Sequence, residues 1–354
     1  MSGPAARRRV LLGQLAEQNL DGLVVTAPAN VRYLSGFIGE GDLLVAPQPG
    51  LCTDRRYEVE AAEQAAGCRV VCAERGHLAG VMESVRQAAL SRVGFEAKHL
   101  TFAAHRSLSE GLPECELVPT TDLVEGLRRR KDPEEIALIE RAAALTDRVL
   151  ADFLPRIRPG PTERRLAWDF RRALVDAGAE DASFTPILAS GPRSALPHAE
   201  PTDRALQPGD ILVVDVGARL EGYCSDLTRT LYLGEPPPEF AARYRAVRQA
   251  QEAGLAALAG GRPAAEVDQA ARRVLEAAGL GEAFSHGLGH GVGLEIHEGP
   301  ALGRHSQATL QVGHVVTIEP GVYFPGWGGI RLEDLVVLEE SGPRLLTHAP
   351  KLDL

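Results

Sequence analysis

The sequence predicts an α+β protein in which a pseudo-symmetric domain is preceded by a smaller α/β domain. In the first third of the chain, short aliphatic runs alternate with helix-like segments, as is typical of an α/β domain. In the remainder, the pattern of QPGDILVVD (207–215) returns in QVGHVVTIE (311–319), and Ala-rich helical segments lie between the two copies. The stretch SHGLGHGVGLEIHEGP (285–300) adds three histidines among glycines, and imidazole is both a metal ligand and a proton carrier.

Composition limits the classes of protein that need considering. A chain of 354 residues is long for one core, so we expect two domains, 1–125 and 126–354. The net charge of −10 gives no electrostatic footprint for nucleic acid, and no apolar run approaches the roughly 20 residues of a membrane span. The five cysteines form no paired CxxC framework, and the N-terminus lacks the apolar centre of a signal peptide. We therefore expect a cytoplasmic protein without nucleic-acid or membrane partners.

The first domain is expected to hold a mostly parallel or mixed sheet. The segment 30–37, with aromatic residues among polar ones, could line a cleft or form a loop packed by its own aromatics. The histidines in this part of the chain are isolated, which argues against a metal site there. The expected strands are 22–28, 42–47, 68–74, 92–97 and 115–121, and the expected helices are 55–66, 77–91 and 101–111.

A long helix is predicted to open the second domain. Asp132 can cap it, Pro133 suits its first turn, and Glu134 and Glu135 lie near its positive end. The basic run 128–131 just before it is expected to be a solvated linker face. Further helices are expected at 162–178, 238–259 and 263–278.

The repeated segments are predicted to form two β-hairpins that carry opposed carboxylates. If the first hairpin turns about Leu220 and Glu221, Asp215 lies opposite Asp226. If the second turns about Gly326, Glu319 lies opposite Glu333. Cross-strand partners have Cβ atoms about 4.5–5.5 Å apart, so ionised pairs would repel unless they were protonated or shared with cations.

Two such pairs in matched copies indicate a dinuclear metal site. Four carboxylates with one imidazole from the 285–300 stretch suit two divalent cations about 3.5–4 Å apart. Oxygen ligands with one nitrogen and no thiolate favour manganese or cobalt, with zinc or iron as alternatives. Two such cations can acidify a shared water and stabilise an oxyanion, so hydrolysis of an amide is the chemistry expected.

Five motifs resemble one family, the metal-dependent proline peptidases: Xaa-Pro dipeptidase (prolidase) and Xaa-Pro aminopeptidase (aminopeptidase P), with the creatinase-type pita-bread catalytic fold and N-terminal domain. The resemblance also covers SGPRSALPHAEPTD (190–203), NVRYLSGF (30–37) and the helix after Asp132, and so nearly the whole chain. It implies a homodimer. The five motifs are VVDVGA (213–218), SDLTRT (225–230), HGLGHGVGLEIHE (286–298), TIEPGVY (317–323) and GIRLED (329–334).

The resemblance also implies roles for individual residues. The implied metal ligands are Asp215, Asp226, His290, Glu319 and Glu333, with Asp226 and Glu333 bridging the two cations. Glu319 would also be the general base. His198 and His297 would line the pocket and stabilise the tetrahedral intermediate, and His286 and Tyr323 would border the substrate. Arg331, on the same strand face as Glu333, would hold that carboxylate or a substrate carboxylate.

The substrate implied is a peptide with proline in its second position. Proline has no N–H, so a dedicated pocket makes chemical sense. We expect an Xaa-Pro dipeptidase, with an Xaa-Pro aminopeptidase acting on longer peptides as the alternative. A catalytically silent binding module is a remote third possibility, because such a module would be expected to lack ligands and none is missing here.

Overall fold

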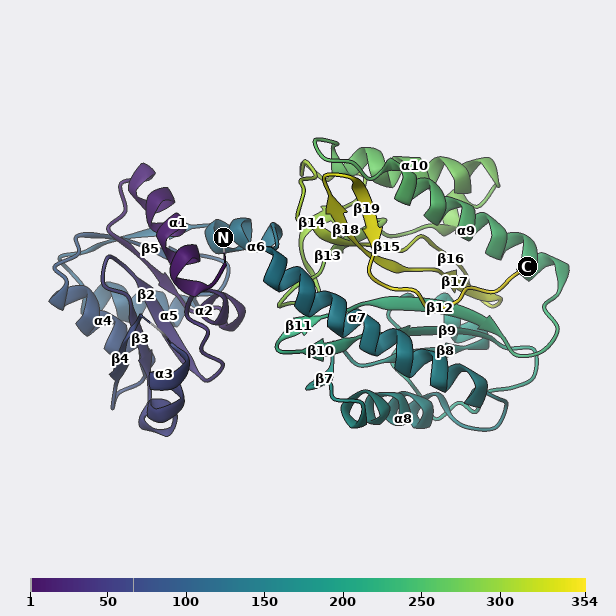
Figure 1. Cartoon of the computed structure of the whole chain (residues 1–354), viewed down its shortest axis with the longest axis horizontal. Coiled ribbons are helices and arrows are strands. Elements are labelled where there is room, and N and C mark those ends of the chain that lie inside the picture. The colour runs from purple at the N-terminus through teal and green to yellow at the C-terminus, as the bar shows by residue number, and fades with distance from the viewer. Residues whose placement is uncertain (1, 66) are drawn as a thin grey trace. The chain divides into compact units, whose positions relative to one another are not determined.

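The computed structural model describes residues 2–65 and 67–354, and its contacts divide the chain into two compact units, Met1–Arg128 and Arg129–Leu354 (Figure 1). Each unit is built from both helices and strands. No helix in the described ranges is long and apolar enough to cross a membrane.

The first unit is a mixed six-stranded sheet with helices packed on it. The strand order is β4-β3-β2-β1-β5-β6; the β1–β2 and β2–β3 pairs are antiparallel, and the other three are parallel. The strands are β1 (Gly22–Val25), β2 (Gly41–Val45), β3 (Gly50–Thr53), β4 (Arg69–Cys72), β5 (Arg92–Glu96) and β6 (Glu116–Thr120). The helices are α1 (Pro4–Glu17), α2 (Pro28–Ser35), the 3-10 turn η1 (Arg55–Tyr57), α3 (Glu58–Gln64), α4 (His77–Gln87), α5 (Phe102–Gly111) and α6 (Leu123–Arg129).

Two features of this unit differ from expectation. The segment 30–37 does not form a loop, because most of it belongs to helix α2, which begins at Pro28 and ends at Ser35. Tyr33 is buried within the helix and Phe37 just beyond it. Proline is tolerated at the first turn of a helix, so Pro28 starts α2 instead of ending a strand. Strand β3 was not predicted, since its four residues GLCT are too short to show a clear period.

The second unit contains two sheet-and-helix halves. Its helices are α7 (Pro133–Phe153), η2 (Leu154–Arg156), α8 (Glu163–Asp176), η3 (Gly191–Ala195), α9 (Pro238–Ala257), α10 (Ala264–Ala277) and η4 (Gly281–Ala283). The strands of the first half are β7 (Asp181–Ala182), β8 (Ile187–Ser190), β9 (Ile211–Val216), β10 (Ala218–Leu220), β11 (Tyr223–Cys224) and β12 (Leu227–Tyr232). Those of the second are β13 (Gly289–Gly291), β14 (Glu298–Leu302), β15 (Val315–Ile318), β16 (Gly321–Phe324), β17 (Gly328–Arg331), β18 (Asp334–Glu339) and β19 (Gly342–Leu345).

The two halves repeat one plan. In the first, β12-β9-β8 pack against α7 and α8 through a core that includes Leu150, Phe170 and Val214. In the second, the sheet β14-β13-β15-β18-β19 packs against α9 and α10 through a core that includes Val247 and Val316 (Figure 1). The predicted pseudo-symmetric α+β domain is therefore present.

The N-terminus of α7 is capped as predicted, but part of the basic run 128–131 before it is buried instead of solvated. Asp132 and Glu135 make a reciprocal capping box, which satisfies backbone N–H groups at the helix start. Arg128 and Lys131 are buried, at 3% and 4% exposure. The Lys131 Nζ lies 2.7 Å from Oε1 of Glu298, so the expected solvated face is wrong for Arg128 and Lys131, whereas Arg130 is exposed. A buried ammonium needs such a partner, because leaving it unpaired would be costly.

The hairpin registers decide where the repeated carboxylates lie. In the second hairpin, Ile318 pairs with Asp334, so Glu319 and Glu333 occupy opposite positions as predicted. In the first, Asp215 pairs with Thr228 and not with Asp226, because the turn is centred on Glu221 and Gly222. The predicted register was therefore wrong by two residues. Since side chains alternate with a period of two, Asp226 remains on the same face as Asp215, diagonally across.

Candidate metal centre

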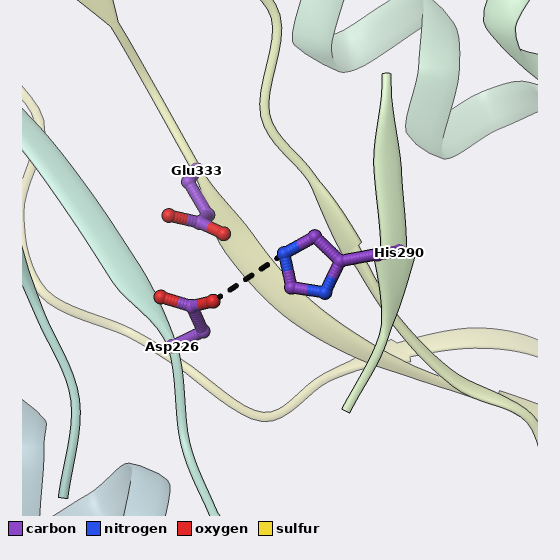
Figure 2. Close-up of side chains that lie close together, drawn as sticks. All are labelled: Asp226, His290 and Glu333. Carbon is purple, nitrogen blue, oxygen red and sulfur yellow. Dashed lines mark ion pairs between the residues drawn. The ribbon is translucent and has the colours of Figure 1, made fainter. Parts of the chain in front are cut away.

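Four of the five predicted ligands lie at or beside the ends of paired strands. Asp215 is near the end of β9 and Asp226 directly precedes β12, while Glu319 directly follows β15 and Glu333 directly precedes β18. His290 is the middle residue of β13. Ligand atoms of Asp226, His290 and Glu333 lie within 4.8 Å of one another, and their side chains converge on one point (Figure 2). Asp215 and Glu319 border the same cavity.

His290 is oriented by its backbone surroundings. Its Nδ1 lies 3.0 Å from the carbonyl of Gly291, so a proton on Nδ1 leaves Nε2 facing the carboxylates. Nε2 lies 3.3 Å from Glu319 Oε1 and 3.6 Å from Asp226 Oδ2. A Cβ at Gly289 would lie 2.0 Å from the Thr317 carbonyl oxygen, and one at Gly291 would lie 2.2 Å from that of Gly299. These glycines therefore let the histidine strand approach its neighbours.

Arg331 holds a different carboxylate from the one expected. Its Nη2 donates to Asp215 Oδ2 at 2.5 Å, and Glu333 is not its direct partner. Its Nη1 donates to the Tyr323 hydroxyl and to the Pro197 carbonyl, and its Nε donates to Thr228 Oγ1. Four of its five N–H groups therefore donate within the protein, which makes Arg331 a support for Asp215, and the residue also borders the cavity.

Two threonines support the ligands and were not predicted. The Thr228 hydroxyl donates to Glu333 Oε2 at 2.6 Å, and the Thr317 hydroxyl donates to Glu319 Oε1 at 3.1 Å. Each lies two residues from a ligand on the same strand path, Thr228 after Asp226 and Thr317 before Glu319. That spacing of two beside a buried carboxylate is the sequence signal that could have identified them.

The carboxylates are crowded enough to disturb one another. Burial, followed by the charges of Glu333 and Asp215, raises the pKa of Asp226 well above its usual value. Burial and the nearby Glu319 and Asp215 do the same to the pKa of Glu333. Burial also raises the pKa of Asp215, which the Arg331 guanidinium offsets only in part.

Glu319 behaves differently from the other three carboxylates. Burial tends to raise its pKa, but the hydrogen bond and charge of His290 outweigh burial and lower the pKa below its ordinary value. The remaining three cannot all be ionised together without added positive charge, which divalent cations would supply.

The donor set fits such cations. The Asp215 Oδ1 is buried and has no hydrogen-bond partner among the described residues, as expected for an oxygen whose partner is an ion. The other donors are carboxylate oxygens and one imidazole nitrogen, which suit hard or borderline divalent metals.

A cavity of about 520 Å³ opens over the ligands. Its volume lies in the range of small-molecule sites. His198, His286 and His297 all border it, and the rings of His290 and His297 are 4.3 Å apart. Tyr323, predicted as a pocket wall, is not among the described residues that border the cavity. Its hydroxyl accepts a hydrogen bond from Arg331 and lies 2.9 Å from Nε2 of His286, and both of those residues do border the cavity. Apolar residues not predicted complete the wall: Phe184, Ile187, Ile296 and Leu302.

Comparison with known proteins agrees with this geometry. The model of metallopeptidase family M24 matches residues 137–340, and the model of the creatinase/prolidase N-terminal domain matches residues 7–130. The chain belongs to metallopeptidase family M24. This M24 chain is therefore a metallopeptidase, and the matched range contains all five predicted ligands.

Proteins named as proline-specific peptidases are similar to this chain over nearly the whole length of both chains. The Xaa-Pro dipeptidase of Pyrococcus furiosus is 34% identical over 347 residues, 98% of each chain. The structure of an Xaa-Pro dipeptidase from Bacillus anthracis superposes with a TM-score of 0.96 at 35% identity, covering 99% of both chains. That of an X-Pro aminopeptidase from Thermotoga maritima gives 0.91 at 33% identity, covering 97% of this chain and 98% of the other.

The crowding of carboxylates predicts a specific stability effect. A carboxyl whose pKa is raised on folding stabilises the fold below the unfolded-state pKa, and this stability is lost as pH rises toward the folded-state value. Asparagine does not ionise, so the Asp226→Asn protein does not lose this stability as pH rises. In metal-free protein we therefore expect the substitution to raise the Tm at pH 8 by about 2 °C or more, and by less at pH 5.

Differential scanning calorimetry in EDTA measures this effect. Asp152→Asn, at an exposed position on α7, is the matched control and should leave the Tm unchanged. Adding Mn²⁺ should then stabilise the wild type more than the Asp226 variant. A chelated Asp226→Asn protein that melts at or below the wild-type temperature at pH 8 would show that the carboxylates do not repel as inferred.

Proposed function

We propose that the chain is an Xaa-Pro dipeptidase that holds two divalent metal ions, manganese or cobalt first and zinc or iron as alternatives. The observation that carries the proposal is the buried convergence of Asp226, His290 and Glu333 beneath a cavity that Asp215 and Glu319 also border. Full-length similarity to the two Xaa-Pro dipeptidases supports the choice of substrate.

In this proposal the residues that would hold the metal ions are Asp215, Asp226, His290, Glu319 and Glu333, and Asp226 and Glu333 would serve both ions. When bound, two divalent cations acidify water near neutral pH and stabilise negative charge on the scissile carbonyl oxygen. Glu319, held by the Thr317 hydroxyl and by His290, accepts a proton from the attacking water and delivers it to the proline nitrogen.

The residues of the cavity wall orient the peptide. His198 and His297 border the cavity without belonging to the ligand cluster, and they can donate to the tetrahedral intermediate. The pKa of His297 is lowered by burial and by His290, so this imidazole is neutral near pH 7 and keeps one N–H donor. His286 borders the cavity beside them, backed by the Tyr323 hydroxyl.

The proposal includes a cytoplasmic homodimer. The five cysteines are all free, as expected of a reducing compartment. The dimer rests on resemblance to the family, and light scattering of the purified protein measures it directly.

Substrate length separates the dipeptidase from the aminopeptidase. With saturating Mn²⁺, we expect Ala-Pro to be hydrolysed with a kcat/KM at least about tenfold above that of Ala-Pro-Ala, the preference that similarity to the two Xaa-Pro dipeptidases supports. Ala-Ala serves as the control for proline selectivity. Rapid cleavage of Ala-Pro-Ala without turnover of Ala-Pro would instead identify an aminopeptidase.

A further inference from the structure

The segment that carries His198 is fixed by a buried carboxylate outside the metal cluster. This segment, 190–202, leaves strand β8 at Ser190, passes through η3 and borders the cavity with Pro197, His198 and Ala199. His198 is exposed, and its imidazole makes no hydrogen bond to a described residue. The position of the imidazole therefore depends on how the backbone around it is held.

Glu163 ties down the two ends of that segment. It is the first residue of α8, following the cap Thr162, and it is fully buried. Its Oε1 accepts from the Ser190 backbone N–H at 2.8 Å and from the Ser190 hydroxyl at 2.7 Å. Its Oε2 accepts from the Thr202 backbone N–H at 3.0 Å and from the Thr202 hydroxyl at 2.7 Å. One carboxylate thus joins residues twelve positions apart, on either side of His198.

Arginines extend the same clamp. The Arg193 Nε donates to Glu163 Oε2 at 3.0 Å, and its Nη2 donates to the carbonyl of Glu200 at 2.6 Å. The Arg204 Nη1 donates to the Ser190 hydroxyl at 2.6 Å and, together with Nη2, to the Asp210 carboxylate. Hydrogen bonds to an ionised acceptor are the strong ones, and a buried carboxylate with five donors holds its surroundings rigidly.

We propose that Glu163 is a positioning residue that sets the place of His198 over the metal cluster, acting through the segment 190–202. The proposal rests on the function proposed above, in which His198 faces the tetrahedral intermediate. No proposed metal ligand lies on this segment or on α8. The segment does meet Arg331, the support of Asp215, at the Pro197 carbonyl, so the Mn²⁺ affinity is measured beside kcat to separate positioning from metal binding.

The test is Glu163→Gln, which keeps the shape but removes the charge and turns an NH₂ group toward donors. We expect kcat for Ala-Pro to fall about 10- to 100-fold, the size of effect that a displacement of about 1 Å produces, with a smaller change in KM. The affinity for Mn²⁺, measured by calorimetry, should stay within about twofold of wild type, since the ligands are untouched. Asp176→Asn, at an exposed position on the same helix, is the matched control and should retain wild-type kcat.

A double-mutant cycle with His198→Ala distinguishes positioning from general damage. If Glu163 acts through His198, the Glu163→Gln/His198→Ala protein should have the kcat of His198→Ala alone, within about twofold. The proposal would be overturned if the kcat losses of the two single variants multiplied in the double variant. It would also be overturned if Glu163→Gln kept the wild-type kcat, or if its Mn²⁺ affinity fell as much as its kcat. If Glu163→Gln does not fold, Thr202→Val removes one donor and leaves the charge; it should lower kcat by about threefold, again only while His198 is present.

A spectroscopic readout keeps the inference separate from the proposed substrate. The C2 proton of His198, assigned by its absence in His198→Ala, should give one NMR signal in the wild type and a shifted or broadened one in Glu163→Gln. An unchanged signal would contradict the positioning role even in a protein that cleaves Ala-Pro. If the wild type does not cleave Ala-Pro, but the His198 signal still differs between the wild type and Glu163→Gln, only the proposed function is overturned and the positioning role stands.

Discussion

Replacing Glu333 by glutamine is expected to lower kcat/KM for Ala-Pro by about 10³-fold or more, because a carboxylate proposed to be shared by two cations is lost. Glu333 is 2% exposed, and its Oε2 already accepts from the Thr228 hydroxyl. The glutamine amide has the same shape and can keep that hydrogen bond. It has only one oxygen, however, whereas a side chain shared by two cations needs two oxygen ligands. The number of Mn²⁺ ions bound per chain, measured by elemental analysis after dialysis, should fall below two.

The control for this variant is Glu340→Gln, at an exposed position one residue beyond β18. It should bind metal and cleave Ala-Pro like the wild type. A Glu333→Gln protein within tenfold of wild-type activity, with two ions still bound, would exclude Glu333 as a shared ligand.

Replacing Glu319 by glutamine is expected to lower kcat by about 10²- to 10⁴-fold, the usual contribution of a general base. Glu319 differs from the other carboxylates because, although burial raises its pKa, the hydrogen bond and charge of His290 lower it by more and favour the ionised form. Its Oε1 faces His290 Nε2 and accepts from the Thr317 hydroxyl. Assaying Glu319→Gln at Mn²⁺ concentrations that saturate its sites separates loss of the base from loss of metal.

Thr317→Val is the companion variant for Glu319. It leaves the carboxylate in place and removes one hydroxyl that orients it, so a loss of about 10- to 100-fold is expected, as for other residues that support metal ligands. Full activity of Glu319→Gln at saturating metal would remove Glu319 from the chemistry and leave it at most a ligand.

The sequence was most informative where local pattern determines structure. The capping box at Asp132 and Glu135 needs only neighbouring residues, and it forms as predicted. The second hairpin is in the predicted register, since the glycines around Gly326 mark its turn. The first hairpin is not. Its turn residues, Glu221 and Gly222, both have positive φ, as in a type I′ turn, a conformation unusual for glutamate and therefore hard to locate from sequence.

The sequence pattern did not predict contacts between segments that are distant in the chain. Arg331 holds Asp215 across 116 positions, although its strand neighbour Glu333 was the expected partner. Lys131 is buried against Glu298, although a basic run before a helix usually faces water. In both cases the partner is set by how the halves of the domain pack, which residue spacing does not encode. The four proposed carboxylate ligands follow from the repeated segments, whereas the choice of His290 among three histidines rests on motifs that resemble those of a known family.

The most direct test of the account is a metal titration followed by activity. Protein stripped with EDTA should not cleave Ala-Pro, and addition of Mn²⁺ should restore cleavage as a second ion binds per chain, because we propose that the four carboxylates and His290 hold two ions. The same titration of Glu333→Gln should show neither the second ion nor the recovery. Full hydrolysis of Ala-Pro in excess chelator would contradict the dinuclear site and the function built on it.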